Sequence, residues 1–62
     1  MKAIKWLKMC YTGLDMGAIY PVEKEFEGTY AGFFLIYDEF GRGVTLHKRL
    51  LGICFEDVSH AS

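Results

Sequence analysis

The chain has 62 residues, which allow one small domain and leave no room for a second hydrophobic core. Hydrophobic residues make up 52% of the sequence and aromatic residues 16%, so enough apolar surface is present to drive folding, and a disordered chain is excluded. Seven Lys and Arg residues against eight Asp and Glu residues give a formal charge of −1, which disfavours non-specific binding to nucleic acid.

The N-terminus and the apolar stretches argue for a cytoplasmic protein. The longest apolar run, residues 31–37, is far shorter than the roughly 20 residues that span a bilayer. Lys2, Lys5 and Lys8 are distributed among apolar residues, whereas a signal peptide keeps its charged and apolar regions apart. We therefore expect no membrane span and no cleaved leader.

Two cysteines, Cys10 and Cys54, are too few for the disulfide framework of small secreted domains. We expect reduced thiols, although pairing of the first and last strands would let the two sulfurs approach each other. A zinc site from these cysteines with His47 and His60 would lack any characteristic ligand spacing. The sequence therefore predicts neither a metal nor a cofactor.

The first half of the chain predicts two strands separated by a loop. Lys2, Lys5 and Lys8 recur every three residues, as on one face of a helix, but the missing N-cap and short length favour a strand over residues 4–10, with Ile4 and Trp6 facing inward. Glycine and aspartate in residues 11–17 predict a loop. Residues 18–25 form the predicted second strand, which must lie at a sheet edge at Pro21 because proline lacks the N–H. Alternation then predicts a solvated row of carboxylates at Glu23, Glu25 and Glu27.

The most apolar segment, residues 29–38, predicts a strand with two apolar faces. We expect Phe34 and Ile36 to belong to the core, with Tyr30 on the same face. So small a chain should cover the other face only in part. That face carries Ala31, Phe33, Leu35 and Tyr37.

The last third of the chain predicts a hairpin, a helical turn and a final strand. Residues 38–43 form a turn in which the Asp38 carboxylate can bond its own backbone two residues on. A short strand over residues 44–46 follows, and then one helical turn over residues 47–51. The final strand contains Ile53 and Phe55 and extends at most to Val58.

These elements predict an all-β fold, a small five-stranded SH3-like barrel with one helical turn before the last strand. An OB-like barrel is the nearest alternative, but it usually needs a longer chain and a helix between its middle strands. Residues 1–58 form the single predicted domain, and residues 59–62 form a frayed tail.

Three segments carry a resemblance to known proteins: MKAIK at residues 1–5, GAIYPV at residues 17–22 and DEFG at residues 38–41. With them the chain resembles a group of small, mostly uncharacterised SH3-like β-barrel proteins of tailed bacteriophages. The resemblance implies a phage or prophage origin, a non-enzymatic accessory role and a location in the host cytoplasm. It transfers no functional residues.

No combination of residues in the sequence predicts an enzyme. A nucleophilic cysteine or serine would need a nearby base, and only His47 and His60 could serve. The predicted glutamate row faces solvent, where no cleft raises a carboxyl pKa. Gly41 and Gly43 lack the third glycine, the following lysine and the strand–turn–helix context of a phosphate loop.

Protein binding is the function that we expect, because so short a chain cannot bury ten aromatic side chains. Partly exposed side chains would form an apolar patch, and nearby basic residues would orient the partner. We expect the partner to be a host protein that the chain binds and inhibits, while a homodimer could cover the same surface. The predicted partner-binding residues are Phe33, Leu35, Tyr37, Phe40, Lys48 and Arg49.

Two alternatives stay open. A small nucleic-acid-binding barrel would stack bases on Tyr11, Tyr37 and Phe40. Its basic residues would be Arg42, Lys48 and Arg49. The second alternative is a structural component of the virion.

Overall fold

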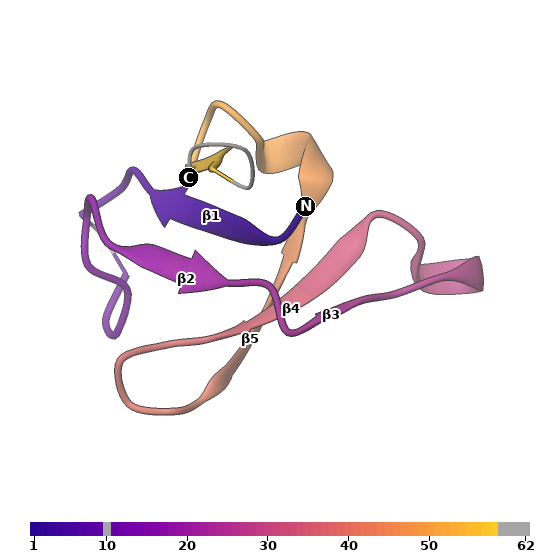
Figure 1. Cartoon of the computed structure of the whole chain (residues 1–62), viewed down its shortest axis with the longest axis horizontal. Coiled ribbons are helices and arrows are strands. Elements are labelled where there is room, and N and C mark those ends of the chain that lie inside the picture. The colour runs from indigo at the N-terminus through magenta and orange to yellow at the C-terminus, as the bar shows by residue number, and fades with distance from the viewer. Residues whose placement is uncertain (10, 59–62) are drawn as a thin grey trace.

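A computed structural model describes residues 1–9 and 11–58 of the chain (Figure 1). Its short strands and 3-10 helices follow one another as β1 (Ala3–Trp6), β2 (Ile19–Pro21), β3 (Lys24–Glu25), η1 (Gly28–Tyr30), β4 (Phe33–Tyr37), β5 (Gly43–His47), η2 (Lys48–Leu50) and β6 (Phe55–Asp57). The predicted all-β fold is confirmed. Within the described ranges no helix has the length and apolar character needed to cross a membrane.

The strands form two antiparallel sheets, ordered β2–β1–β6 and β3–β4–β5 (Figure 1). The predicted second strand is divided between them. The Val22 N–H donates to the Lys2 carbonyl of the first sheet at 2.8 Å, and the next N–H, of Glu23, donates to the Leu35 carbonyl of the second sheet at 2.8 Å. Since successive backbone groups point in opposite directions, the chain passes from one sheet to the other here. The two hydrogen-bonded ladders stay separate in the described part of the chain, so the sheets do not close into one continuous barrel.

The core lies between the inward faces of the two sheets. Ile4 and Trp6 of β1 and Phe34 and Ile36 of β4 are fully buried, as predicted from their alternation. The Phe34 ring meets the Phe55 ring of β6 edge to face, with 5.3 Å between centroids. The buried apolar side chains are Ile4, Trp6, Leu14, Tyr20, Phe34, Ile36, Leu46 and Phe55.

The turn at residues 38–43 is confirmed, and it is built around the buried carboxylate of Asp38. Asp38 accepts hydrogen bonds from the backbone N–H groups of Phe40 at 2.9 Å and Arg42 at 2.8 Å, and from Arg42 Nε at 3.0 Å. Burial raises the pKa of Asp38, but the hydrogen bonds from Arg42 and Phe40 outweigh it, and the pKa lies below its ordinary value. The turn also contacts the loop before β2, because the Glu39 N–H donates to the Gly13 carbonyl at 2.8 Å.

Three predicted element boundaries are wrong. β1 ends at Trp6 and does not reach residue 10. Tyr30 does not share the core face of β4, because Gly32, with φ of +94°, ends the alternation and leaves Tyr30 in η1 with 64% of its surface exposed. Ile53 lies outside the last strand, which begins only at Phe55.

Other predictions are confirmed or concern residues outside the described ranges. The helical turn predicted over residues 47–51 is present as η2. Cys54 is a half-buried free thiol. Cys10 and residues 59–62, which include His60, are outside the described ranges, and so are the predicted approach of the two cysteines and the predicted frayed tail.

Candidate interaction surface

The side chains of sheet β3–β4–β5 that point away from the core form a surface that we call the outer face. In β4 this face carries the odd-numbered residues, because the even-numbered ones are buried. The pairing register places side chains of β3 and β5 beside them on the same face. The outer face consists of Lys24, Phe33, Leu35, Tyr37, Gly43, Thr45 and His47.

One end of the outer face contains an apolar pocket of about 330 Å³, lined by Phe26, Tyr30, Phe33 and Thr45. Phe26 is held beside β4 by the hydrogen bond from its N–H to the Phe33 carbonyl at 3.0 Å. The short helix η1 brings the Tyr30 ring to 6.4 Å from the Phe33 ring, at an interplanar angle of 72°. This volume lies at the lower end of the range for ligand pockets, roughly 300 to 1,000 Å³, and has room for a side chain of a partner.

His47 borders the pocket as a packed residue. Its ring meets the Phe33 ring edge to face, with 4.7 Å between centroids. Its Nδ1 accepts a hydrogen bond from the Arg49 N–H at 3.0 Å and so caps η2. Gly32 lies so close that a Cβ there would be 2.8 Å from Nε2. These contacts fix the imidazole, and they explain why the chain has glycine at position 32.

The predicted partner-binding residues do not all lie together. Phe33, Leu35 and Tyr37 alternate along β4 and share the outer face, with Tyr37 48% exposed. Phe40 is exposed in the hairpin turn, where the Arg42 guanidinium lies 5.0 Å from the centre of its ring. It is therefore separated from the pocket by the length of β4.

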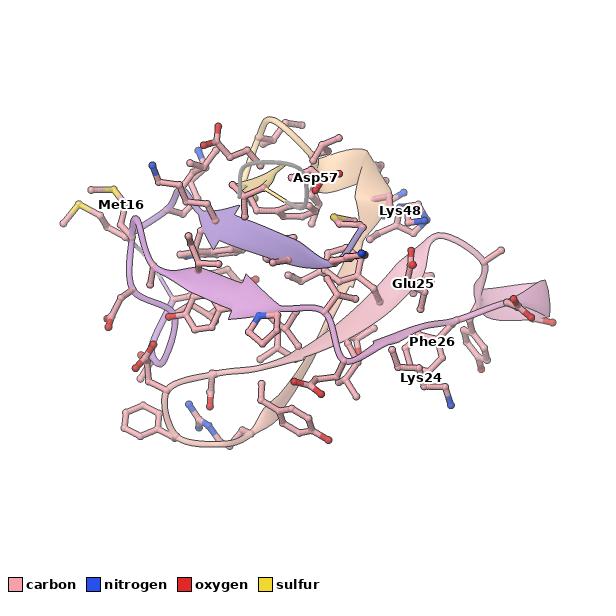
Figure 2. The ribbon with its side chains drawn as sticks, viewed as in Figure 1. Met16, Lys24, Glu25, Phe26, Lys48 and Asp57 are labelled. Carbon is pink, nitrogen blue, oxygen red and sulfur yellow. The ribbon has the colours of Figure 1, made fainter. Side chains whose placement is uncertain are left out.

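Lys48 and Arg49 lie in η2, after the last residue of the outer face. Figure 2 shows the Lys48 and Glu25 side chains turned toward each other, and Lys48 Nζ is 2.8 Å from Glu25 Oε1. The N-terminal amino group of Met1 lies 3.7 Å from the other carboxylate oxygen. The hydrogen bond and charge of Lys48, with the N-terminal charge, lower the pKa of Glu25. Arg49 is exposed.

Some of the glutamates and basic residues that the sequence analysis singled out form ion pairs within the chain. Glu23, Glu25 and Glu27 are all exposed, as predicted, but Glu25 in addition has two cationic partners. Of the three predicted basic residues, Lys48 is paired with Glu25, and Arg42 is paired with Asp38 at 3.0 Å. Pairing within the chain reduces the positive potential that these cations present to a polyanion.

Candidate metal ligands do not gather in the part of the chain that the structure describes. No three side chains of His, Cys, Asp or Glu converge there in a way that could hold a metal ion. Among the bases that sequence reasoning considered, His47 is engaged as the cap of η2, and His60 lies outside the described ranges.

Sequence reasoning missed four residues around the pocket. Phe26 had a usable signal, since it continues the alternation of Val22 and Lys24 and so belongs on the face of Lys24. Tyr30 had none, because its position depends on the turn at Gly32. The positions of the other two, Thr45 and His47, can be assigned only once the pairing of β5 with β4 is known.

The chain matches no protein-family model, and neither the curated proteins nor the solved structures contain a significant match to it.

Proposed function

We propose that this chain is a non-enzymatic protein-binding module, and that its partner binds on the outer face with an apolar side chain in the pocket. The observation that carries the proposal is the pocket itself. Three aromatic side chains, of Phe26, Tyr30 and Phe33, line a hollow on a solvent-facing sheet surface, although the opposite face of the same sheet already provides the core.

The physical argument rests on desolvation. Aromatic side chains on a surface are stabilised when a partner removes them from water, and a few such residues around a central pocket dominate the binding energy of protein interfaces. Tyr30 is 64% exposed and Leu35 is half-buried, so both have surface left to lose in a complex. Tyr37 extends this exposed apolar area along β4 away from the pocket.

Charge favours a protein over a nucleic acid as the partner. A nucleic-acid surface needs unpaired cations beside its stacking rings. Here Lys48 and Arg42 already have carboxylate partners, and Lys24 Nζ lies 5.3 Å from the centre of the Phe26 ring. The exposed carboxylates of Glu23 and Glu27 flank the same strand and would repel phosphates.

The fold and the biological setting are parts of the same proposal. Three features support classification as a small SH3-like barrel. They are the pairing orders β2–β1–β6 and β3–β4–β5, the passage of one segment between both sheets, and the position of η2 before the last strand. From the resemblance to phage barrels of this type we infer that the partner is a host protein, that binding inhibits this protein, and that the chain acts in the host cytoplasm.

The test compares capture by matched variants. The wild-type chain is used to isolate its stoichiometric partner from a bacterial lysate, and affinity for the purified partner is then measured for Tyr30→Ala and Ile53→Ala. Both side chains are similarly exposed, at 64% and 58%, but only Tyr30 lines the pocket. We expect Tyr30→Ala to weaken binding about 10- to 100-fold, as for an interface hot spot, and Ile53→Ala to leave it unchanged.

Two results would contradict the proposal. One is equal affinity of the wild-type chain and Tyr30→Ala for the partner. The other is the lack of any stoichiometric protein partner together with salt-sensitive retention on a nucleic-acid column, which would favour the nucleic-acid alternative. Recovery of the chain from intact virions would favour a structural role.

A further inference from the structure

The strands at the sheet edges differ in how they resist pairing with another chain. Proteins protect their edges with proline, charged side chains or very short strands. β2 contains Pro21, β3 consists of two charged residues, and β6 contains Glu56 and Asp57. β5 is the exception among the described edge strands, because it has five residues and neither a charged residue nor a proline.

The backbone of β5 also presents hydrogen-bonding groups to its open side. The carbonyls of Leu35 and Phe33 accept from the N–H groups of Glu23 and Phe26, so the odd-numbered residues of β4 bond toward β3. The even-numbered residues of β4 therefore bond toward β5, where they pair with Val44 and Leu46.

It follows that the backbone groups of alternate residues in β5, those of Gly43, Thr45 and His47, point away from β4. No hydrogen bond joins these N–H and C=O groups to another backbone group elsewhere in residues 1–9 and 11–58. Gly43 and Thr45 are exposed.

We propose that β5 binds an extended segment of the partner as an additional antiparallel strand, and that a large apolar side chain of this segment, opposite Thr45, enters the pocket. This inference rests on the proposed function and names the form of its ligand. Main-chain hydrogen bonds would supply affinity and the pocket would supply specificity. Thr45 connects the two features, because it lies on the edge strand and also lines the pocket. A side chain directly opposite it would have its Cβ about 5 Å away.

A second copy of the chain fits this edge less well. Antiparallel pairing of two β5 strands about Thr45 would place Thr45 opposite Thr45 and Gly43 opposite His47. Neither pair puts a large apolar side chain on the outer face, so both pockets would remain unfilled. A foreign segment that has such a residue at the central position satisfies the edge and the pocket together.

The experiment uses a display library of randomised octapeptides selected on the full chain, followed by synthesis of one selected peptide. We expect selected peptides to share one large apolar residue and to slow amide hydrogen exchange at Gly43, Thr45 and His47. Thr45→Pro removes an edge N–H that β4 does not use, and should weaken binding at least 10-fold. Thr45→Val changes the same side chain but keeps this N–H, so it should bind at least 10-fold more tightly than Thr45→Pro. Ile53→Ala, at an exposed side chain outside β5 and the pocket, should bind like the wild-type chain.

A test on the peptide side does not depend on whether Thr45→Pro folds. N-methylation of the amides on one edge of the selected peptide should abolish binding, whereas N-methylation of the alternate amides should not. Equal effects of the two methylated peptides would overturn the inference.

Other outcomes separate this inference from the proposed function. A peptide whose binding needs Tyr30 but leaves the β5 amides unprotected would support the pocket and overturn strand addition. Amide protection at β5 that rises with chain concentration in the absence of peptide would assign the edge to a second copy. Selection of no peptide would also overturn strand addition, while the capture experiment with Tyr30→Ala would still decide the proposed function.

Discussion

Two neighbouring residues of β4, Ile36 and Tyr37, test the assignment of the two faces of sheet β3–β4–β5. Ile36 is fully buried and Tyr37 is 48% exposed, although both side chains are large and the residues are adjacent. Ile36→Ala removes buried methyl and methylene groups and leaves a cavity, which should cost about 2 to 5 kcal/mol of unfolding free energy. Tyr37→Ala alters a side chain that is exposed on the outer face and should cost no more than about 1 kcal/mol.

These costs are large relative to the stability of so small a domain. At roughly 0.05 to 0.15 kcal/mol per residue, a chain of 62 residues has about 3 to 9 kcal/mol of unfolding free energy. Ile36→Ala should therefore remove at least about a fifth of it, and at the upper end of the cost it unfolds outright a chain at the lower end of this stability range.

The assay is urea unfolding followed by the fluorescence of Trp6, which is the only tryptophan of the chain and is fully buried. With a denaturant slope of about 1 kcal/mol per molar urea, Ile36→Ala should lower the midpoint by at least about 2 M, and Tyr37→Ala by no more than about 1 M. Equal losses for the two variants, or a larger loss for Tyr37→Ala, would refute the assignment of the outer face.

Three further predictions concern the polar and backbone contacts that hold the loops. The buried Tyr20 hydroxyl accepts a hydrogen bond from the Asp15 N–H at 2.7 Å. Tyr20→Phe should therefore lower the unfolding free energy by about 1 kcal/mol in urea titrations. An unchanged urea midpoint would contradict this. The pKa of Asp38 is lowered in the folded chain, so its ionised form contributes stability above the unfolded value near 3.8, and this contribution is lost as the pH falls through the lowered folded value. Thermal melts between pH 6 and pH 2 should show that Asp38→Asn flattens this acid-dependent loss, and an unaltered profile would count against the role of Asp38. Gly13 and Gly41 both have positive φ, but a Cβ at Gly13 would lie 2.6 Å from Asp38 Oδ2, whereas a Cβ at Gly41 would have open space. Gly13→Ala should therefore lower the melting temperature more than Gly41→Ala. Equal effects would rule out the steric contact as the cause.

Local signals made much of the fold predictable. Alternation identified the buried residues of β1 and β4, because one face of each strand packs on the core. The turn after β4 followed from the ability of the Asp38 carboxylate to accept a hydrogen bond from the backbone two residues on.

The parts that were not predictable depend on contacts between distant residues. The division of the second strand into β2 and β3 results from two consecutive N–H groups, of Val22 and Glu23, bonding to different sheets. Tyr30 was assigned to the wrong face because the alternation begins only after Gly32. For the same reason sequence reasoning found Phe33, Leu35 and Tyr37 but not the pocket, whose walls come from the residue after β3 and from η1, β4 and β5.

Site-specific photo-crosslinking tests the central claim most directly. A photoreactive phenylalanine analogue would replace Tyr30 in one chain and Met16 in another, since both side chains are exposed and Met16 lies in Figure 2 at the end of the molecule opposite Phe26. Binding on the outer face predicts that illumination in a bacterial lysate links one defined protein to position 30 and none to position 16. Crosslinking of the same protein from position 16 alone, or equally from both positions, would contradict it.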